Sequence, residues 1–281
     1  MRIWQLRRGA WVLPPGGAIM GILNTTPDSF SDGGRHNSLA SALQHAELMA
    51  DAGADIIDIG GESTRPGADE VDETTEAERT LPVIRALRQA RPELLISIDT
   101  RHPGVAAQAL DAGADIINDV TGLAHPDMRR LCASRACGIV LMHMKGEPRT
   151  MQQAPHYEDV VAEVHAFFEE RIALAEACGI AAERLCLDPG IGFGKSTEHN
   201  LALIRHLGEL RVRELPLMMA LSRKRFMGAL LGDVDYVKSS PLPTVVMSLL
   251  AAERGADLHR VHDVAELHRA LRLRQALRSG D

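Results

Sequence analysis

Short apolar runs alternate with longer amphipathic segments along most of the chain. Runs rich in Ile, Val and Leu are typical of strands that are buried on both faces of a parallel sheet. Before Gly53, apolar residues instead recur at helical spacing, at Leu39, Ala42, Leu43, Ala46 and Met49. The apolar runs predict strands at 18–23, 55–60, 95–99, 115–119, 138–143, 184–188, 216–221 and 257–261.

Predicted helices lie between these strands, at 38–52, 73–90, 103–112, 125–136, 156–178, 198–210, 223–232 with 241–254, and 263–278. Eight strands that alternate with helices favour a closed (β/α)₈ TIM barrel, with a doubly wound open sheet as the alternative. No linker interrupts the 281 residues, so we expect residues 1–281 to form a single domain. The segment "RIWQLRRGAWVL" predicts a short N-terminal hairpin that closes the barrel bottom.

A repeated phrase marks the joints of this pattern. "AGAD" occurs at 52–55 and at 112–115, and "RGAD" follows at 254–257. Each copy comes after a predicted helix and before a predicted strand, where a glycine suits the left-handed position just past a helix. The sequence after each strand differs, and three of these connections are long and polar: 24–37, 60–73 and 143–159. In a barrel they open on the C-terminal face, where active sites lie.

Composition narrows the class of protein. The net charge of −7 argues against bulk nucleic-acid binding, and basic residues are scattered rather than clustered. The four cysteines show no metal-binding spacing, as expected for thiols in a reducing cytoplasm. No segment reaches the length of a membrane span. We therefore expect a cytoplasmic protein that has no nucleic-acid or membrane partner.

Polar residues lie at the predicted strand ends and would share one rim of the barrel: Asn24, Asp58, Asp99, Asn118, His143, Asp188, Ser222 and His262. Asp99, Asn118 and Asp188 combine acceptors with an amide that both donates and accepts. Such a set suits a flat heterocycle with an amino-pyrimidinone edge. For each single residue, capping a helix or bracing a loop is the competing interpretation.

Basic residues near the same rim predict an anion site. Arg65 and Arg260 follow strand ends, and Lys224 and Arg225 open the helix after the seventh strand, with Ser222 at the expected N-cap. A Schiff-base role for Lys224 and an ordinary solvated basic face are the alternatives.

Two further patterns concern phosphate and metal. "GIGFGKS" at 190–196 is not a P-loop, because Pro189 stands where that motif requires glycine. No histidine pair has zinc-site spacing. A hard cation that is held mainly by substrate phosphate needs only one or two protein oxygens, which Asn24, Asp28 and Asp32 offer.

Eight stretches, taken together, resemble the dihydropteroate synthase family of the folate pathway. They are "MGILNTTPDSFSDGG", "GGESTRPGA", "SIDTRHP", "INDVTG", "LMHMKGEPRTMQ", "LDPGIGFGK", "SRKRFMG" and "RVHDV". They run in order from residue 20 to residue 264. The resemblance implies a (β/α)₈ barrel that forms a homodimer. It also implies a reaction that joins 4-aminobenzoate to 6-hydroxymethyl-7,8-dihydropterin diphosphate and releases diphosphate, with Mg²⁺.

The resemblance also implies roles for individual residues. Pterin-edge contacts fall on Asp99, Asn118, Asp188 and Lys224, with Met142 and Phe193 against the ring. Asn24 would bind Mg²⁺. Diphosphate contacts fall on Thr64, Arg65, Arg260 and His262, with Asp32 in the same converging loops. Phe30, Pro66 and Lys224 would border the aminobenzoate pocket, and Arg225 would meet the aminobenzoate carboxylate. The residues expected to act in catalysis are Asp99, Asp188, Lys224, Arg260 and His262.

Three departures from the family pattern stand out. Ala220 stands where the family has a glycine, and Arg225 stands where it often has a serine. The segment "DYVKSSPLPTV" lacks the usual glycine-containing helix start, which bears on dimer packing. Three rival functions remain open: a pterin-binding methyltransferase domain, a Schiff-base aldolase that uses Lys224, and a binding protein without turnover.

Overall fold

The computed structural model describes residues 2–25, 34–62, 70–146 and 150–278. A parallel eight-stranded sheet forms its centre, in the order β8-β7-β6-β5-β4-β3-β10-β9. The strands are β3 (Ala18–Asn24), β4 (Ile56–Gly60), β5 (Leu95–Asp99), β6 (Ile116–Asp119), β7 (Gly138–Met142), β8 (Leu185–Asp188), β9 (Met218–Met219) and β10 (Leu258–Val261). A parallel bridge between Leu187 and Leu217 links the two ends of this order. The predicted (β/α)₈ TIM barrel is confirmed, and the doubly wound alternative is wrong.

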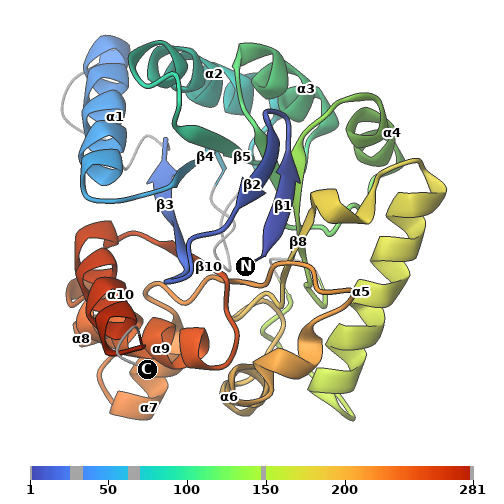
Figure 1. The fold of residues 1–281 in the computed structure, drawn as a ribbon, viewed down its shortest axis with the longest axis vertical. Helices are drawn as coiled ribbons and strands as arrows, with labels where there is room; N and C mark the ends of the chain where they lie inside the picture. The colour runs from blue at the N-terminus through green and yellow to red at the C-terminus, as the bar shows by residue number, and fades with distance from the viewer. Residues whose placement is uncertain (1, 26–33, 63–69, 147–149, 279–281) are drawn as a thin grey trace.

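Helices surround the strands (Figure 1). They are α1 (Gly34–Asp51), α2 (Glu73–Ala90), α3 (Pro103–Ala112), α4 (Pro126–Ser134), α5 (Val160–Ala177), α6 (Thr197–Arg205), α7 (Arg225–Leu231), α8 (Val234–Ser239), α9 (Leu242–Glu253) and α10 (Val264–Arg278). The described residues also include two short 3₁₀ helices, η2 (Ala182–Arg184) and η3 (Leu207–Leu210). Within the described residues, none of the helices is long and apolar enough to cross a lipid bilayer.

Several predicted boundaries were wrong, for local reasons. The helix predicted from 156 begins at Val160, because the Asp159 carboxylate caps it by accepting the N–H groups of Val161 and Ala162. Helix α8 was not predicted at all, although Asp233 caps it in the same way through the N–H of Tyr236. The strand predicted at 216–221 is only the two-residue β9.

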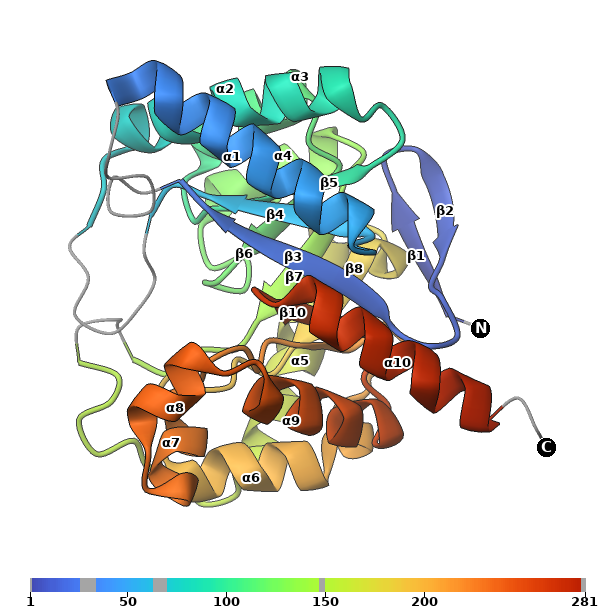
Figure 2. The same ribbon diagram turned by 90° about the vertical axis from the view of Figure 1, so that its left-hand side faces the viewer.

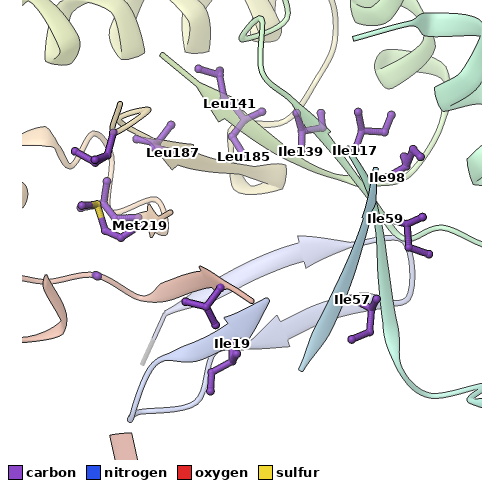
Figure 3. Close-up of a cluster of buried hydrophobic side chains, with 14 of the residues drawn as sticks. Ile19, Ile57, Ile59, Ile98, Ile117, Ile139, Leu141, Leu185, Leu187 and Met219 are labelled. Carbon is purple, nitrogen blue, oxygen red and sulfur yellow. The ribbon is translucent and has the colours of Figure 1, made fainter. Parts of the chain in front are cut away.

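Each face of the barrel wall packs against its own apolar cluster. One lies between strands and helices, and Figure 3 shows members from successive strands, including Ile57, Ile98, Ile117 and Leu187. The other fills the lower bore with side chains such as Ile56, Leu95, Ile116, Cys186 and Leu258. Successive strand residues therefore alternate between the two clusters, as the pleat of a strand requires.

The N-terminal hairpin closes the bottom of the bore, as predicted. Strands β1 (Ile3–Leu6) and β2 (Gly9–Val12) pair antiparallel and lie at one end of the barrel, while β3 runs toward the other end (Figure 2). Trp4 and Leu6 are buried in the inner cluster. The indole N–H of Trp4 donates to the carbonyl of Arg184 at 2.8 Å. This end of the barrel is therefore filled, and the open end is the C-terminal rim.

The repeated phrase builds the same joint three times. Gly53, Gly113 and Gly255 all have left-handed φ angles of 105°, 116° and 104°. The N–H of the following alanine reaches back to a helix carbonyl, as in a Schellman cap. The aspartate that follows then accepts a backbone N–H from the neighbouring strand segment: Asp55 from Ile19, Asp115 from Ile96 and Asp257 from Leu217. The repeat is thus scaffold, because each copy ends a helix and fixes the register of a strand.

Candidate active site

The bore changes from apolar to polar toward its open end. Five strands show this change. In each of them, the residue two positions after the apolar residue of the lower bore (Ile56, Leu95, Ile116, Cys186 or Leu258) is polar and faces the bore as well. These residues are Asp58, Ser97, Asn118, Asp188 and Arg260. Most of them are buried, and their proximity follows from strand register rather than from loop conformation.

Arg260 connects three strands inside the bore. Its Nε donates to Asp58 Oδ2 at 2.6 Å, and its terminal nitrogen donates to Asp99 Oδ2 at 2.7 Å. Asn118 Nδ2 donates to the same Asp58 oxygen at 3.0 Å. Asp58 lies on the rim, as predicted from the sequence, but no function was predicted for it. Its role was missed because a contact between β4 and β10 leaves no local pattern in the sequence.

Charge is unevenly compensated in this cluster. Burial raises the pKa of Asp99 to about 7, although the Arg260 charge opposes that shift, and Asp58 adds to it. Burial disfavours the charged form of Arg260, but Asp58 and Asp99 outweigh it and raise the pKa of the guanidinium. Asp99 Oδ1 is buried and has no hydrogen-bond partner among the described residues. A buried acceptor of this kind is suited to a donor on a ligand.

Asp188 and Lys224 form the second charged group. Asp188 Oδ1 accepts the N–H of Gly190 at 2.8 Å, and burial raises the pKa of the carboxyl. Burial also lowers the pKa of Lys224 to about 8, with the charge of Asp188 opposing the shift. Lys224 Nζ lies 4.4 Å from the ring centroid of Phe193. Met142 pairs with Asp188 in strand register and is buried beside it. Asp188, Lys224, Phe193 and Met142 are therefore brought together, as the resemblance implied.

The turn at 222–225 differs from its prediction. Ser222 is not the N-cap of α7, because Arg223 adopts a left-handed φ of 55° and Lys224 takes the capping position without a side-chain bond. Ser222 Oγ instead contacts His262 Nδ1 at 2.9 Å and accepts the backbone N–H of His262 at 3.2 Å. Arg225 opens α7 with an exposed side chain. Ser222 thus orients His262 rather than the helix end.

The remaining predicted site residues divide into two groups. Asn24 is the last residue of β3 and pairs in register with Gly60, which in turn pairs with Asp99. Phe30, Asp32, Thr64, Arg65 and Pro66 lie outside the described residues. Among the residues that are described, no group of three or more His, Cys, Asp or Glu side chains is arranged to hold a metal ion.

The site also contains a buried lysine that the sequence analysis considered only as part of the rejected phosphate motif. Lys195 Nζ donates to His143 Nδ1 at 2.9 Å. Burial lowers the pKa of Lys195 to about 7 and that of His143 to about 2, and in His143 the Lys195 charge adds to the shift. The only sequence signal for it was a lysine directly after the glycine-rich run that follows β8.

Chemically, the rim has two adjoining regions. One contains the acceptors and the amide of Asp99, Asn118 and Asp188, and the other contains the cation Lys224 beside the ring of Phe193. Arg260 lies on β10 and His262 directly follows that strand, so both belong to the same part of the rim. Such a site has the hydrogen-bonding groups for a flat polar ring in the bore and the positive charge for an anionic group beside it.

Comparisons with known proteins show which family the chain resembles. A family profile described as "Pterin binding enzyme" matches residues 20–262. A dihydropteroate synthase from Escherichia coli is 49% identical over 260 residues, which cover 92% of this chain and 90% of the relative. Two structures of the Xanthomonas albilineans dihydropteroate synthase each superpose with a TM-score of 0.85. The one with 4-aminobenzoic acid is 47% identical and covers 93% of both chains, and the one with 7,8-dihydropteroate is 44% identical and covers 96% of both.

The raised pKa of Asp99 predicts a pH dependence of ligand binding. Below pH 7 the carboxyl takes up a proton and loses its capacity to accept two donors, so affinity for a dihydropterin should fall as the pH drops from 8 to 6. A group with a pKa of 7 predicts a loss of about tenfold over that range. Calorimetric titration of the wild-type protein and of Asp99→Asn measures it. The variant should lack this step; an equal decline in both proteins would show that another group is responsible.

Proposed function

This chain belongs to the dihydropteroate synthase family of pterin-binding enzymes, and from that premise we propose how its rim carries out the reaction. The enzyme condenses 6-hydroxymethyl-7,8-dihydropterin diphosphate with 4-aminobenzoate and yields 7,8-dihydropteroate and diphosphate. The observation that carries the assignment of residues is the convergence of Asp99, Asn118 and Asp188 in one bore beside Lys224.

The bore is the pterin site in this proposal. Asp188, whose Oδ1 already accepts one backbone N–H, accepts the donors of the pyrimidinone edge, and Asn118 supplies the amide that both donates and accepts. Met142 and Phe193 cover the faces of the ring. The shared salt bridge keeps Arg260 at the wall of the bore, where its guanidinium lies close to the ring without displacing it.

The anionic end of the substrate lies over the positive side of the rim. Arg260 and His262 stabilise the charge that develops on the departing diphosphate, and Ser222 holds the His262 ring in position. The carbon–oxygen bond at the exocyclic CH₂ breaks ahead of attack, with electron density supplied by the dihydropterin ring. The neutral amine of 4-aminobenzoate then attacks that carbon and loses a proton. Thr64 and Arg65 complete the diphosphate contacts in this proposal, with Asp32 in the same loops. Phe30, Pro66 and Arg225 complete the contacts to aminobenzoate.

Mg²⁺ fits the donor set at the rim. Mg²⁺ keeps several waters and needs only one or two protein oxygens when substrate phosphates are present. Asn24 has an amide oxygen at the end of β3, where Asn24 pairs in register with Gly60 and Gly60 pairs with Asp99. When bound there, the ion neutralises charge on the departing diphosphate.

We also propose a homodimer in the cytoplasm. Large apolar side chains are exposed on neighbouring helices α7 to α10: Leu230, Leu231, Val234, Tyr236, Leu242, Val246, Leu250, Leu273 and Leu277. On α9 three of them recur every four residues and so lie along one face. An apolar face of this kind supports burial against a second copy. The four cysteines are free thiols, which supports a reducing compartment.

The reaction itself is tested by incubating the protein with dihydropterin diphosphate, 4-aminobenzoate and Mg²⁺, and detecting dihydropteroate and diphosphate by mass spectrometry.

Asp188→Ala should bind a dihydropterin at least about tenfold more weakly, because buried donors of the ring lose their acceptor. The control Asp111→Ala removes an exposed carboxylate that pairs with Arg135 and should behave as wild type. Absence of product, or borohydride trapping of a Lys224 adduct, would overturn the assignment.

The metal proposal predicts a selective effect of Asn24→Ala. Loss of the only protein oxygen that we assign to the ion should raise the Mg²⁺ concentration for half-maximal turnover by roughly tenfold or more. Binding of a pterin that lacks the diphosphate should stay unchanged in the same variant. A wild-type Mg²⁺ response in Asn24→Ala would remove this residue from the metal site.

The dimer proposal predicts that the 30.5-kDa chain sediments at twice its mass. Introducing charge on the apolar face of α9, with Val246→Glu and Leu250→Glu together, should give monomers. The matched control is Leu48→Glu, which changes an exposed leucine of α1 and should leave the mass unaltered. A wild-type protein that sediments as a monomer at micromolar concentration would rule the dimer out.

A further inference from the structure

Lys195 is a buried lysine whose side-chain nitrogen contacts three backbone carbonyls and one histidine ring nitrogen. Its side chain is 3% exposed. Besides His143 Nδ1, Nζ contacts the carbonyls of Phe193 at 2.9 Å, Gly190 at 3.1 Å and His143 at 3.3 Å. Among the described residues, no carboxylate forms a salt bridge with it. The lysine therefore ties two segments of backbone together, and its hydrogen bonds go to these segments rather than to a carboxylate, although its charge also acts on Asp188.

These two segments are the residue after β7 and the loop 189–194 after β8. They lie in direct backbone contact, since a Cβ at Gly190 would clash with the carbonyl of His143 and one at Gly194 with the carbonyl of Lys145. Both glycines have left-handed φ angles, of 66° and 62°. Lys195 Nζ bonds to both sides of this contact, to His143 and to the carbonyls of Gly190 and Phe193. The loop therefore packs closely against the neighbouring segment, and Lys195 Nζ donates hydrogen bonds to both.

The same loop carries groups that face the proposed pterin site. The N–H of Gly190 fixes Asp188 Oδ1 at 2.8 Å. Phe193 lies against Lys224 Nζ, and a Cβ at Gly192 would stand 3.3 Å from Lys224 Cδ. A shift of this loop would therefore move the Asp188 carboxylate and the ring of Phe193 together.

We propose that Lys195 is a positioning residue for pterin binding: its ammonium fixes the 189–194 loop on His143 and thereby orients Asp188 and Phe193. The inference rests on the proposed function of the bore. A purely structural need is a poor explanation, because a methionine would fill the same volume without burying a charge. What the ammonium adds is three directed donors, and all of the acceptors that it contacts belong to His143 or to the loop.

The test replaces the ammonium and retains the length of the side chain. Lys195→Met should raise the KM for dihydropterin diphosphate about tenfold or more, because misplacement of a positioned group weakens its contacts. The KM for aminobenzoate, measured at saturating pterin substrate, should stay within about twofold, since the loop's fixed groups face the pterin. Lys145→Met is the control. Lys145 lies on the same segment, bonds to Glu163 and the carbonyl of His156, and has its Nζ 4.2 Å from the ring centroid of Tyr157. Its replacement should change neither constant, because the Tyr157 hydroxyl still donates to the carbonyl of Gly194.

The outcomes separate the two proposals. If wild-type protein binds no pterin, the proposed function fails before Lys195 is tested. If wild type binds and folded Lys195→Met binds equally well, or loses both substrates in parallel, the positioning role is wrong. Should Lys195→Met fail to fold, Tyr157→Phe replaces it, because the Tyr157 hydroxyl donates to the carbonyl of Gly194 at 2.9 Å and holds the same loop. Selective loss of pterin affinity in that variant supports the proposal, and unchanged affinity contradicts it.

Discussion

The guanidinium of Arg260, shared between Asp58 and Asp99, is the interaction on which the polar half of the barrel depends. Two carboxylates at this depth require a counter-charge, and Arg260 provides one charge for both. Burial, to which the Asp58 charge adds, raises the pKa of Asp99 despite the Arg260 charge, and Asp99 Oδ1 has no hydrogen-bond partner among the described residues. A ligand that brings N–H donors into the bore supplies that partner. The electrostatics of the scaffold therefore favour a ligand with N–H donors in the bore, where we propose the pterin site.

The scaffold is rigid where the site needs precise positions. Each repeated glycine-alanine-aspartate joint ends a helix and clamps the start of a neighbouring strand, so the register that brings Asp58, Asn118 and Arg260 together is set at the far end of the barrel. The hairpin fills that end with Trp4 and leaves the C-terminal rim as the open face. Stability and chemistry are thus divided between the two ends of the same strands.

The sequence predicted the strands, most helices, the hairpin and the residues of the rim, because periodicity and the glycine joints are local signals. It failed where a function depends on a distant contact. Asp58 received no role because its partners Arg260 and Asn118 lie on other strands. Ser222 was assigned to a helix cap because its partner His262 lies forty residues away in the chain. Lys195 was examined only as part of a phosphate motif, although its acceptors are backbone carbonyls that no sequence pattern shows.

A crystal structure with a dihydropterin bound tests the central claim most directly. The account predicts the pyrimidinone edge within hydrogen-bond distance of Asp188 and Asn118, a donor of the ring on Asp99, and Arg260 still paired with Asp58. A pterin bound outside the bore, or one that enters it only when Arg260 leaves both carboxylates, would contradict the account.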